Sequence, residues 1–164
     1  MTGLLILAAI AVFVTLTIIT LKSNAGVVAL ALMSGFVLNT YVGSEFALLV
    51  SKILPTNAVW ATSIARLVCI LLPALLVLWF LRKTASGSIA VLNIPLAILA
   101  GLVVILFSVP QLPFSAQSQL SSTTFWQYIR EYQVAIVCVT LFVATVQFWL
   151  MRPASSDKHK KDKH

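Results

Sequence analysis

Residues 59–81 read VWATSIARLVCILLPALLVLWFL, an almost unbroken apolar run that is closed by Arg82 and Lys83. A helix of about 20 apolar residues is long enough to cross the hydrocarbon core of a bilayer. Four further apolar runs predict membrane-spanning helices at residues 4–21, 25–42, 89–107 and 134–151. We therefore expect an all-α, polytopic transmembrane helix bundle of about five spans in residues 1–152, followed by a disordered basic tail in residues 153–164.

The composition supports this interpretation for the whole chain. Of the 164 residues, 60% are hydrophobic and 9% are charged. Soluble domains contain about 25% charged residues, so this chain has too few charges to cover a water-exposed surface. The sequence therefore predicts an integral membrane protein.

The distribution of Lys and Arg predicts the orientation, because cytoplasmic loops carry an excess of both. The outer side would hold only Lys52 and Arg130, beside Glu45 and Glu131. The cytoplasmic side would hold Lys22, Arg82, Lys83, Arg152 and the tail lysines Lys158, Lys160, Lys161 and Lys163. With a cytoplasmic tail and five spans, the N-terminus lies outside.

Two of the segments that connect the predicted spans have compositions that indicate their structure. In residues 43–57, Glu45, Ser51 and Lys52 interrupt a cluster of apolar residues, which predicts a short helix lying in the membrane interface. Residues 108–133 are rich in Ser, Gln, Thr and Pro and are expected to form the longest loop. That loop ends in aromatic residues, as expected where a chain re-enters the membrane.

Arg66 is the one charged residue inside a predicted span. An Arg at a helix centre costs about 2.5–3.5 kcal/mol on insertion scales. Because Arg66 lies outward of the midpoint of its span, the pattern favours a side chain that extends to the outer headgroups. A role in an anion or proton pathway is the functional alternative. A third possibility for Arg66 is an ion pair with Glu45 or Glu131 at the outer surface.

Other polar and small residues within the spans suggest helix packing. The amides of Asn39, Asn93 and Gln147 are expected to hydrogen-bond between helices, with a polar pore lining as the alternative. Small residues four positions apart let helix backbones approach closely. Such pairs are Ala31 and Gly35 in the second span, and Ala97 and Gly101 in the fourth.

The spans lack the residue types that catalysis would need. None of the five predicted spans contains Asp, Glu or His. Intramembrane hydrolysis requires paired carboxylates, a metal site or an activated nucleophile with its base. We therefore expect no enzyme activity, cofactor or metal. The expected partners are anionic headgroups at the tail and other membrane subunits or a second copy of the chain, but not nucleic acid.

Three stretches resemble the colicin V production protein (CvpA) family: SGFVLNTYVG (Ser34–Gly43), ARLVCILLPALLVLWFLRK (Ala65–Lys83) and VLNIPLAILAGLVV (Val91–Val104). The resemblance covers about residues 1–125. The chain departs from the family at Lys22–Gly26, which reads KSNAG in place of a charged Gly-rich turn, and in its fifth span. The resemblance implies an accessory protein of the bacterial inner membrane, linked to export or envelope maintenance.

The leading functional interpretation is a non-enzymatic accessory or assembly subunit of a bacterial inner membrane. The alternative is a small channel or transporter subunit lined by Asn39, Arg66, Asn93 and Gln147. A holin-like pore former is a third, suggested by the small size, high apolarity and basic tail.

Overall fold

A computed structural model describes residues 2–53, 58–81 and 89–150, which are almost entirely helical and contain no strand within these ranges. The elements are α1 (Thr2–Thr20), α2 (Ala25–Ile53), α3 (Ala58–Phe80), α4 (Ile89–Ser108), a 3-10 turn η2 (Val109–Gln111), α5 (Phe114–Ser121), α6 (Thr124–Glu131) and α7 (Gln133–Leu150). In the described residues, α2, α3, α4 and α7 are long and apolar enough to cross a membrane, and α1 adds a shorter apolar helix. The predicted all-α bundle is confirmed.

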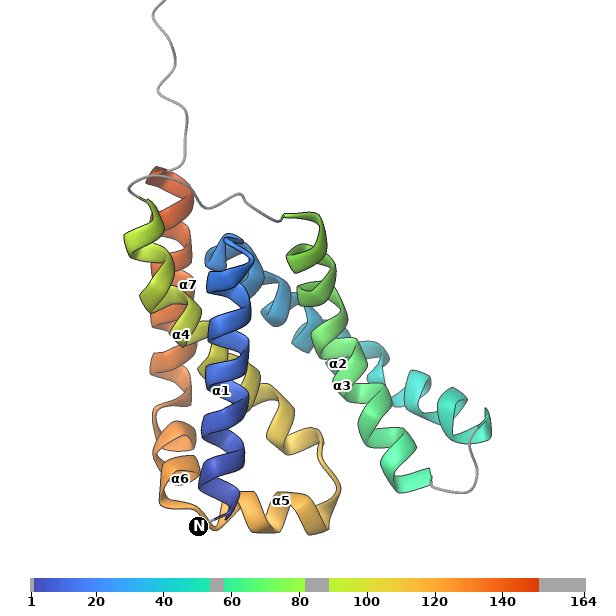
Figure 1. Cartoon of the computed structure of the whole chain (residues 1–164). Helices are drawn as coiled ribbons and strands as arrows, with labels where there is room; N and C mark the ends of the chain where they lie inside the picture. The colour runs from blue at the N-terminus through green and yellow to red at the C-terminus, as the bar shows by residue number, and fades with distance from the viewer. Residues whose placement is uncertain (1, 54–57, 82–88, 151–164) are drawn as a thin grey trace, which may run out of the picture.

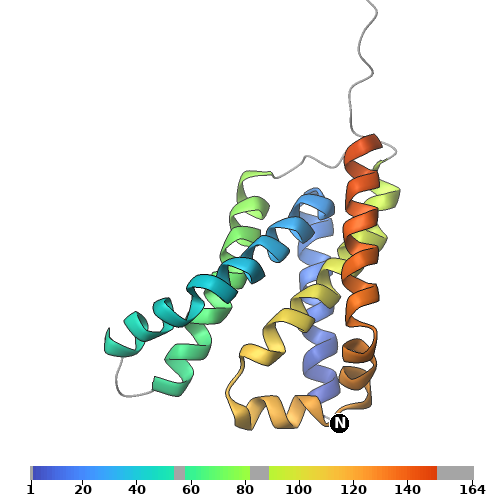
Figure 2. The ribbon, with the colours of Figure 1, turned by 180° about the vertical axis from the view of Figure 1, so that it is seen from behind.

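The long helices form two parts that share α2 (Figures 1 and 2). One part contains α4, which contacts both α1 and α7, together with the first half of α2. The other part is a hairpin in which α3 packs along α2 and makes only sparse contacts with α4 and η2. The start of α1 and the end of α7 lie at opposite ends of the bundle (Figure 1), an arrangement compatible with the five crossings predicted from the sequence.

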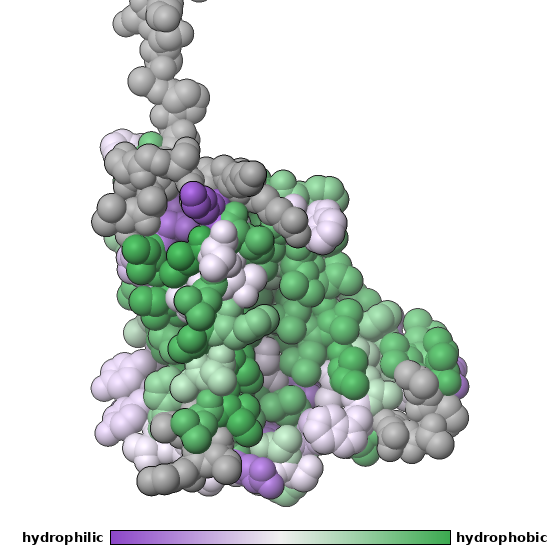
Figure 3. All heavy atoms as spheres, viewed as in Figure 1, coloured by the Kyte–Doolittle hydropathy of each residue, from purple (hydrophilic) through white to green (hydrophobic). Residues whose placement is uncertain are grey.

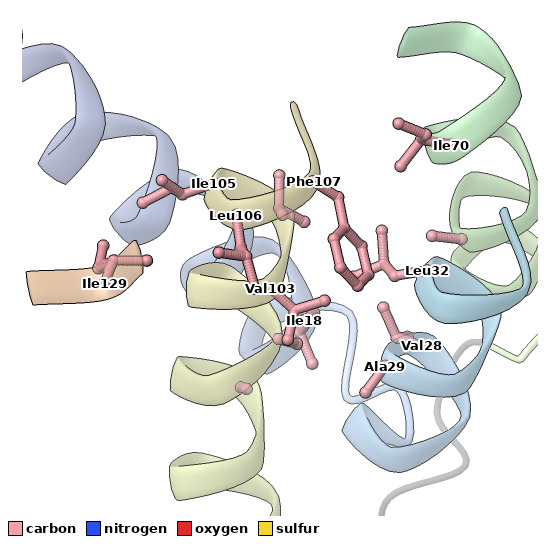
Figure 4. Close-up of a cluster of buried hydrophobic side chains, with 14 of the residues drawn as sticks. Ile18, Val28, Ala29, Leu32, Ile70, Val103, Ile105, Leu106, Phe107 and Ile129 are labelled. Carbon is pink, nitrogen blue, oxygen red and sulfur yellow. The ribbon is translucent and has the colours of Figure 1, made fainter. Parts of the chain in front are cut away.

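The core is centred on α4. Its side chains Val103, Ile105 and Leu106 are buried between α1 and α6 on one side and α2 on the other (Figure 4). Phe107 stacks on Phe36 of α2, with ring centroids 4.2 Å apart and an angle of 18° between the planes. This contact ties the middle of α2 to the end of α4.

The outside of the bundle is apolar. Hydrophobic side chains cover the middle of the visible face, whereas hydrophilic ones gather near the two ends (Figure 3). Large apolar side chains such as Phe13, Trp79 and Phe142 are about 70% exposed, their exposed fractions being 72%, 67% and 70%. In water such a surface would aggregate. The apolar outer surface and the long apolar helices indicate an integral membrane protein.

Small residues occupy the closest helix contacts. A Cβ atom added to Gly35 of α2 would overlap the carbonyl oxygen of Ile70 in α3. A Cβ at Gly101 of α4 would lie 2.9 Å from the carbonyl oxygen of Ala11 in α1. The hydroxyl of Thr15 donates to the carbonyl oxygen of Ala97 at 3.3 Å in the same α1–α4 contact. Ala31, the partner of Gly35 in the sequence pattern, is half-buried against the core.

The second span is longer than the sequence indicates. The predicted helix end at residue 42 is wrong, and residues 43–53 do not form a separate interfacial helix, because α2 continues without a break to Ile53. Residues 54–57, the last part of the predicted interfacial helix, lie outside the described part of the chain. Gly43 lies inside this helix and does not end it. It is buried, and the side chain of Asn39 lies over it. A helix of 29 residues is about 44 Å long, which exceeds the hydrocarbon thickness of about 30 Å. The helix must therefore tilt or extend beyond the hydrocarbon core, and Glu45 lies exposed in its final third.

The segment expected to be the longest loop contains two short helices instead. In α6, the hydroxyl of Thr123 accepts a hydrogen bond from the backbone N–H of Trp126 at 3.3 Å and so caps the helix. Trp126 and Ile129 are buried, while Tyr128 on the other face is 60% exposed. This alternation is typical of a helix lying at a membrane surface.

Candidate functional site

The turn between α1 and α2 carries two polar residues into the interior. Lys22 adopts a left-handed conformation with a φ of 49°. The backbone N–H of Ser23 donates to Ile18 at 3.3 Å, and that of Lys22 donates to Ile19 at 3.1 Å, which is a Schellman motif closing α1. Because the chain reverses so tightly, Ser23 and Asn24 are buried, with exposed fractions of 0% and 4%.

Asn24 caps the start of α2. The first backbone N–H groups of a helix have no partner within the helix itself. The Asn24 Oδ1 atom accepts from the N–H groups of Gly26 at 2.9 Å and Val27 at 3.4 Å. The side chain therefore satisfies donors that would otherwise be buried without a partner.

Two further amides reach the same helix start from other elements. Asn93 of α4 accepts from the backbone N–H of Ala25 at 2.7 Å, and its Nδ2 donates to the carbonyl oxygen of Ser23 at 2.9 Å. The Oε1 atom of Gln147 in α7 accepts from the N–H of Gly26 at 3.1 Å. The Nε2 atom of Gln147 donates to Asn93 Oδ1 at 3.3 Å. We call Asn24, Asn93 and Gln147 the amide cluster.

The amide cluster is suited to holding helices together rather than to chemistry. Asn93 and Gln147 are buried, with exposed fractions of 5% and 1%. Amides do not ionise near neutral pH, so they cannot act as general acids or bases. Their oxygen atoms instead face the positive end of the α2 dipole. Gly26 leaves room for this arrangement, because a Cβ at that position would lie 2.6 Å from Gln147 Oε1.

Asn39 lies apart from the amide cluster, in the middle of α2. Its side chain is 8% exposed, and its Oδ1 atom has no hydrogen-bond partner in the described structure. The oxygen lies over Gly43, one turn further along the same helix. The interhelical hydrogen bonds expected of the three amides are thus present for Asn93 and Gln147, whereas no such bond is formed by the Asn39 oxygen.

Arg66 lies in a third location, on the face of α3 that is turned toward η2. It is half-buried and borders an open hollow of about 410 Å³. The lining is Val59, Thr62, Ser63 and Arg66 on one side and Pro110, Gln111, Leu112 and Pro113 on the other. No lining residue is acidic, so neither Glu45 nor Glu131 faces Arg66 across this hollow.

The four polar residues predicted as a pathway are therefore divided among three places. Only Asn93 and Gln147 are brought together. The side chain of Asn24 and the backbone carbonyl of Ser23 lie at the same helix start, and neither residue is among those predicted from the sequence. The signal that could have identified Asn24 is its place as a capping residue directly before an apolar run.

The remaining predicted residues lie outside the described part of the chain. These are the tail lysines, Lys158, Lys160, Lys161 and Lys163. Among residues 2–53, 58–81 and 89–150, no group of His, Cys, Asp and Glu side chains is arranged to hold a metal ion.

Comparison with known proteins identifies no relative: no family model, no curated protein and no solved structure matches the chain.

Proposed function

We propose that this chain is a non-enzymatic subunit of a bacterial inner membrane that packs against other membrane proteins or a second copy of itself. The observation that carries the proposal is the hairpin formed by α3 and the second half of α2, residues 40–53, which we call the arm. It splays away from α1, α4 and α7 in both views (Figures 1 and 2).

The outer surface of the arm is suited to contacts inside the membrane. Exposed apolar side chains line α3 along its length: Val59, Trp60, Ile64, Val68, Leu72, Leu75, Leu76, Trp79 and Phe80. Among the described residues, α3 makes only sparse contacts with α4 and η2, so the arm is joined to the other helices mainly through α2. It therefore leaves more surface free for a neighbouring helix than a closely packed bundle of the same helices would.

A channel within one chain is the alternative, and the arrangement of polar groups does not favour it. Conduction of ions or polar solutes needs polar groups that line a common passage. Asn93 and Gln147 are instead hydrogen-bonded to the buried start of α2. The resemblance to the colicin V production protein family points, like the arm, to an accessory role in export or envelope maintenance.

Site-specific photo-crosslinking in intact membranes tests the subunit proposal. A photoreactive residue replaces Leu76 on the arm or, as the matched control, Phe142 on α7; both side chains are exposed. We expect a discrete crosslinked species at fixed stoichiometry from position 76 and none from position 142. Equal crosslinking from both positions would argue against a specific contact on the arm.

A flux measurement on the purified protein in liposomes tests the rival functions. We expect no solute flux. Flux that is abolished by Arg66→Ala would establish the channel instead, and lysis of cells on expression would indicate the holin-like function.

The orientation has a direct test. In a background without Cys69 and Cys138, we introduce Ser118→Cys in α5 or Ser156→Cys in the tail. Ser118 is exposed, and the excess of Lys and Arg on the opposite side predicts that it faces outside. We expect a membrane-impermeant maleimide to label only the Ser118→Cys protein in intact cells. Labelling of Ser156→Cys alone would invert the proposed topology.

A further inference from the structure

An apolar groove runs between α1 and α3, next to the hollow at Arg66. Its volume is about 360 Å³, and nearly all of its lining is apolar. Val14 of α1 contributes from one side and Leu67, Leu71 and Leu78 of α3 from the other, with Leu32 of α2 also in the lining. On the α3 side, the groove thus begins at Leu67, the residue that directly follows Arg66.

The groove and the hollow share one wall. Leu112 lines both, and Arg66 and Leu67 are consecutive residues of α3. From Leu67 to Leu78 the groove extends about 16 Å along the helix. The guanidinium group of Arg66, with hydroxyl and amide groups nearby, therefore lies at one end of the apolar groove.

The charge of Arg66 calls for a partner of opposite sign. The exposed neighbours Ile64 and Val68 on α3 are apolar, and its hollow contains no acidic residue. A cation at membrane depth is costly unless it is paired or reaches the headgroup layer. The hydroxyls of Thr62 and Ser63 and the amide of Gln111 lie in the same hollow. Guanidinium groups bind phosphate through paired, charge-assisted hydrogen bonds.

From this geometry we propose that the protein binds an anionic phospholipid between α1 and α3. The phosphate group is held at Arg66, with Ser63 and Gln111 beside it, and one acyl chain lies in the groove along Leu67, Leu71 and Leu78. The lipid comes from the leaflet on the side of the α2–α3 connection, because Arg66 lies in the half of α3 nearer that connection. This inference goes beyond the proposed subunit function and does not depend on it.

Native mass spectrometry of the full chain in detergent tests the proposal by titration with phosphatidylglycerol and with phosphatidylcholine of identical acyl chains. We expect phosphatidylglycerol to bind about tenfold more tightly, because its phosphate charge is not offset by the cationic choline that phosphatidylcholine carries. Arg66→Gln should abolish this preference, and Arg66→Lys should retain part of it. Arg130→Gln, which removes an exposed Arg of α6, is the matched control and should retain it fully. The tail lysines are present in every variant, so a difference in preference between two variants does not come from the tail.

A second variant tests the groove separately from the charge. Val14→Trp fills the groove from α1 and should weaken binding of both phospholipids while leaving the preference for phosphatidylglycerol. Equal affinity of the unaltered protein for the two lipids would overturn the proposal, as would an unchanged preference in Arg66→Gln. Complete displacement of phosphatidylglycerol by inorganic phosphate would also overturn it, because the site would then bind free anions rather than lipid.

Discussion

Replacing Asn93 with Leu is expected to lower the free energy of unfolding by about 2–4 kcal/mol, the largest loss for any of the three amides. Asn93 links three elements, because it bonds to Ala25 and Ser23 at the start of α2 and to Gln147 of α7. Leu has a similar volume but can replace none of these hydrogen bonds. The N–H of Ala25 and the carbonyl oxygen of Ser23 would be left buried, where water cannot reach them. Unfolding of the purified protein by heat or by a denaturing detergent measures the loss.

The matched control is the same change at Asn39. This side chain is also buried, but its Oδ1 atom has no hydrogen-bond partner in the described structure. Replacing a buried amide oxygen that has no partner with an apolar group removes a desolvation cost. Asn39→Leu should therefore leave stability unchanged or raise it. Equal losses at the two positions would show that the hydrogen bonds of the amide cluster do not distinguish Asn93 from Asn39.

The positions of the spanning helices could be read from the sequence because they depend on composition alone. In lipid every backbone polar group must be paired within the segment, so an apolar run of sufficient length has to be a helix. Charged and polar residues then mark the ends, as at Lys22 and Arg82. The same reasoning fails for residues 43–53. There the apolar residues are interrupted by polar ones, and the helix continues because α3 packs along it.

The candidate site could be predicted only in part, because it depends on tertiary contacts. Asn93 and Gln147 are polar residues in apolar runs, which is enough to expect interhelical hydrogen bonds. Nothing in the local sequence indicates that both reach the start of α2, or that Asn39 does not. The residues around Arg66 could not be predicted from the sequence either. Those opposite it follow the end of α4, more than 40 positions away along the chain.

The second large effect is expected at the closest approach of α2 and α3. Gly35→Ala should lower the free energy of unfolding by about 1–3 kcal/mol. The added methyl group would overlap the carbonyl oxygen of Ile70, and its nearest other neighbours are the Ile70 carbonyl carbon at 2.9 Å and Cα at 3.0 Å. All three are backbone atoms of a facing helix, so relief requires the two helices to separate. Separation would also weaken the neighbouring side-chain contacts along the arm.

Gly43→Ala is the control that isolates this effect, because it makes the same change in the same helix. The nearest atoms to the added methyl group would all belong to the side chain of Asn39, within α2 itself. That side chain can rotate away without losing a hydrogen bond of its oxygen. Ala is also favoured over Gly inside a helix by about 1 kcal/mol, which offsets the cost of the rotation. We therefore expect thermal unfolding in detergent to show a clear loss for Gly35→Ala and little change for Gly43→Ala. Equal losses would mean that α2 needs glycine for flexibility, and that the close α2–α3 contact is not what stabilises the arm.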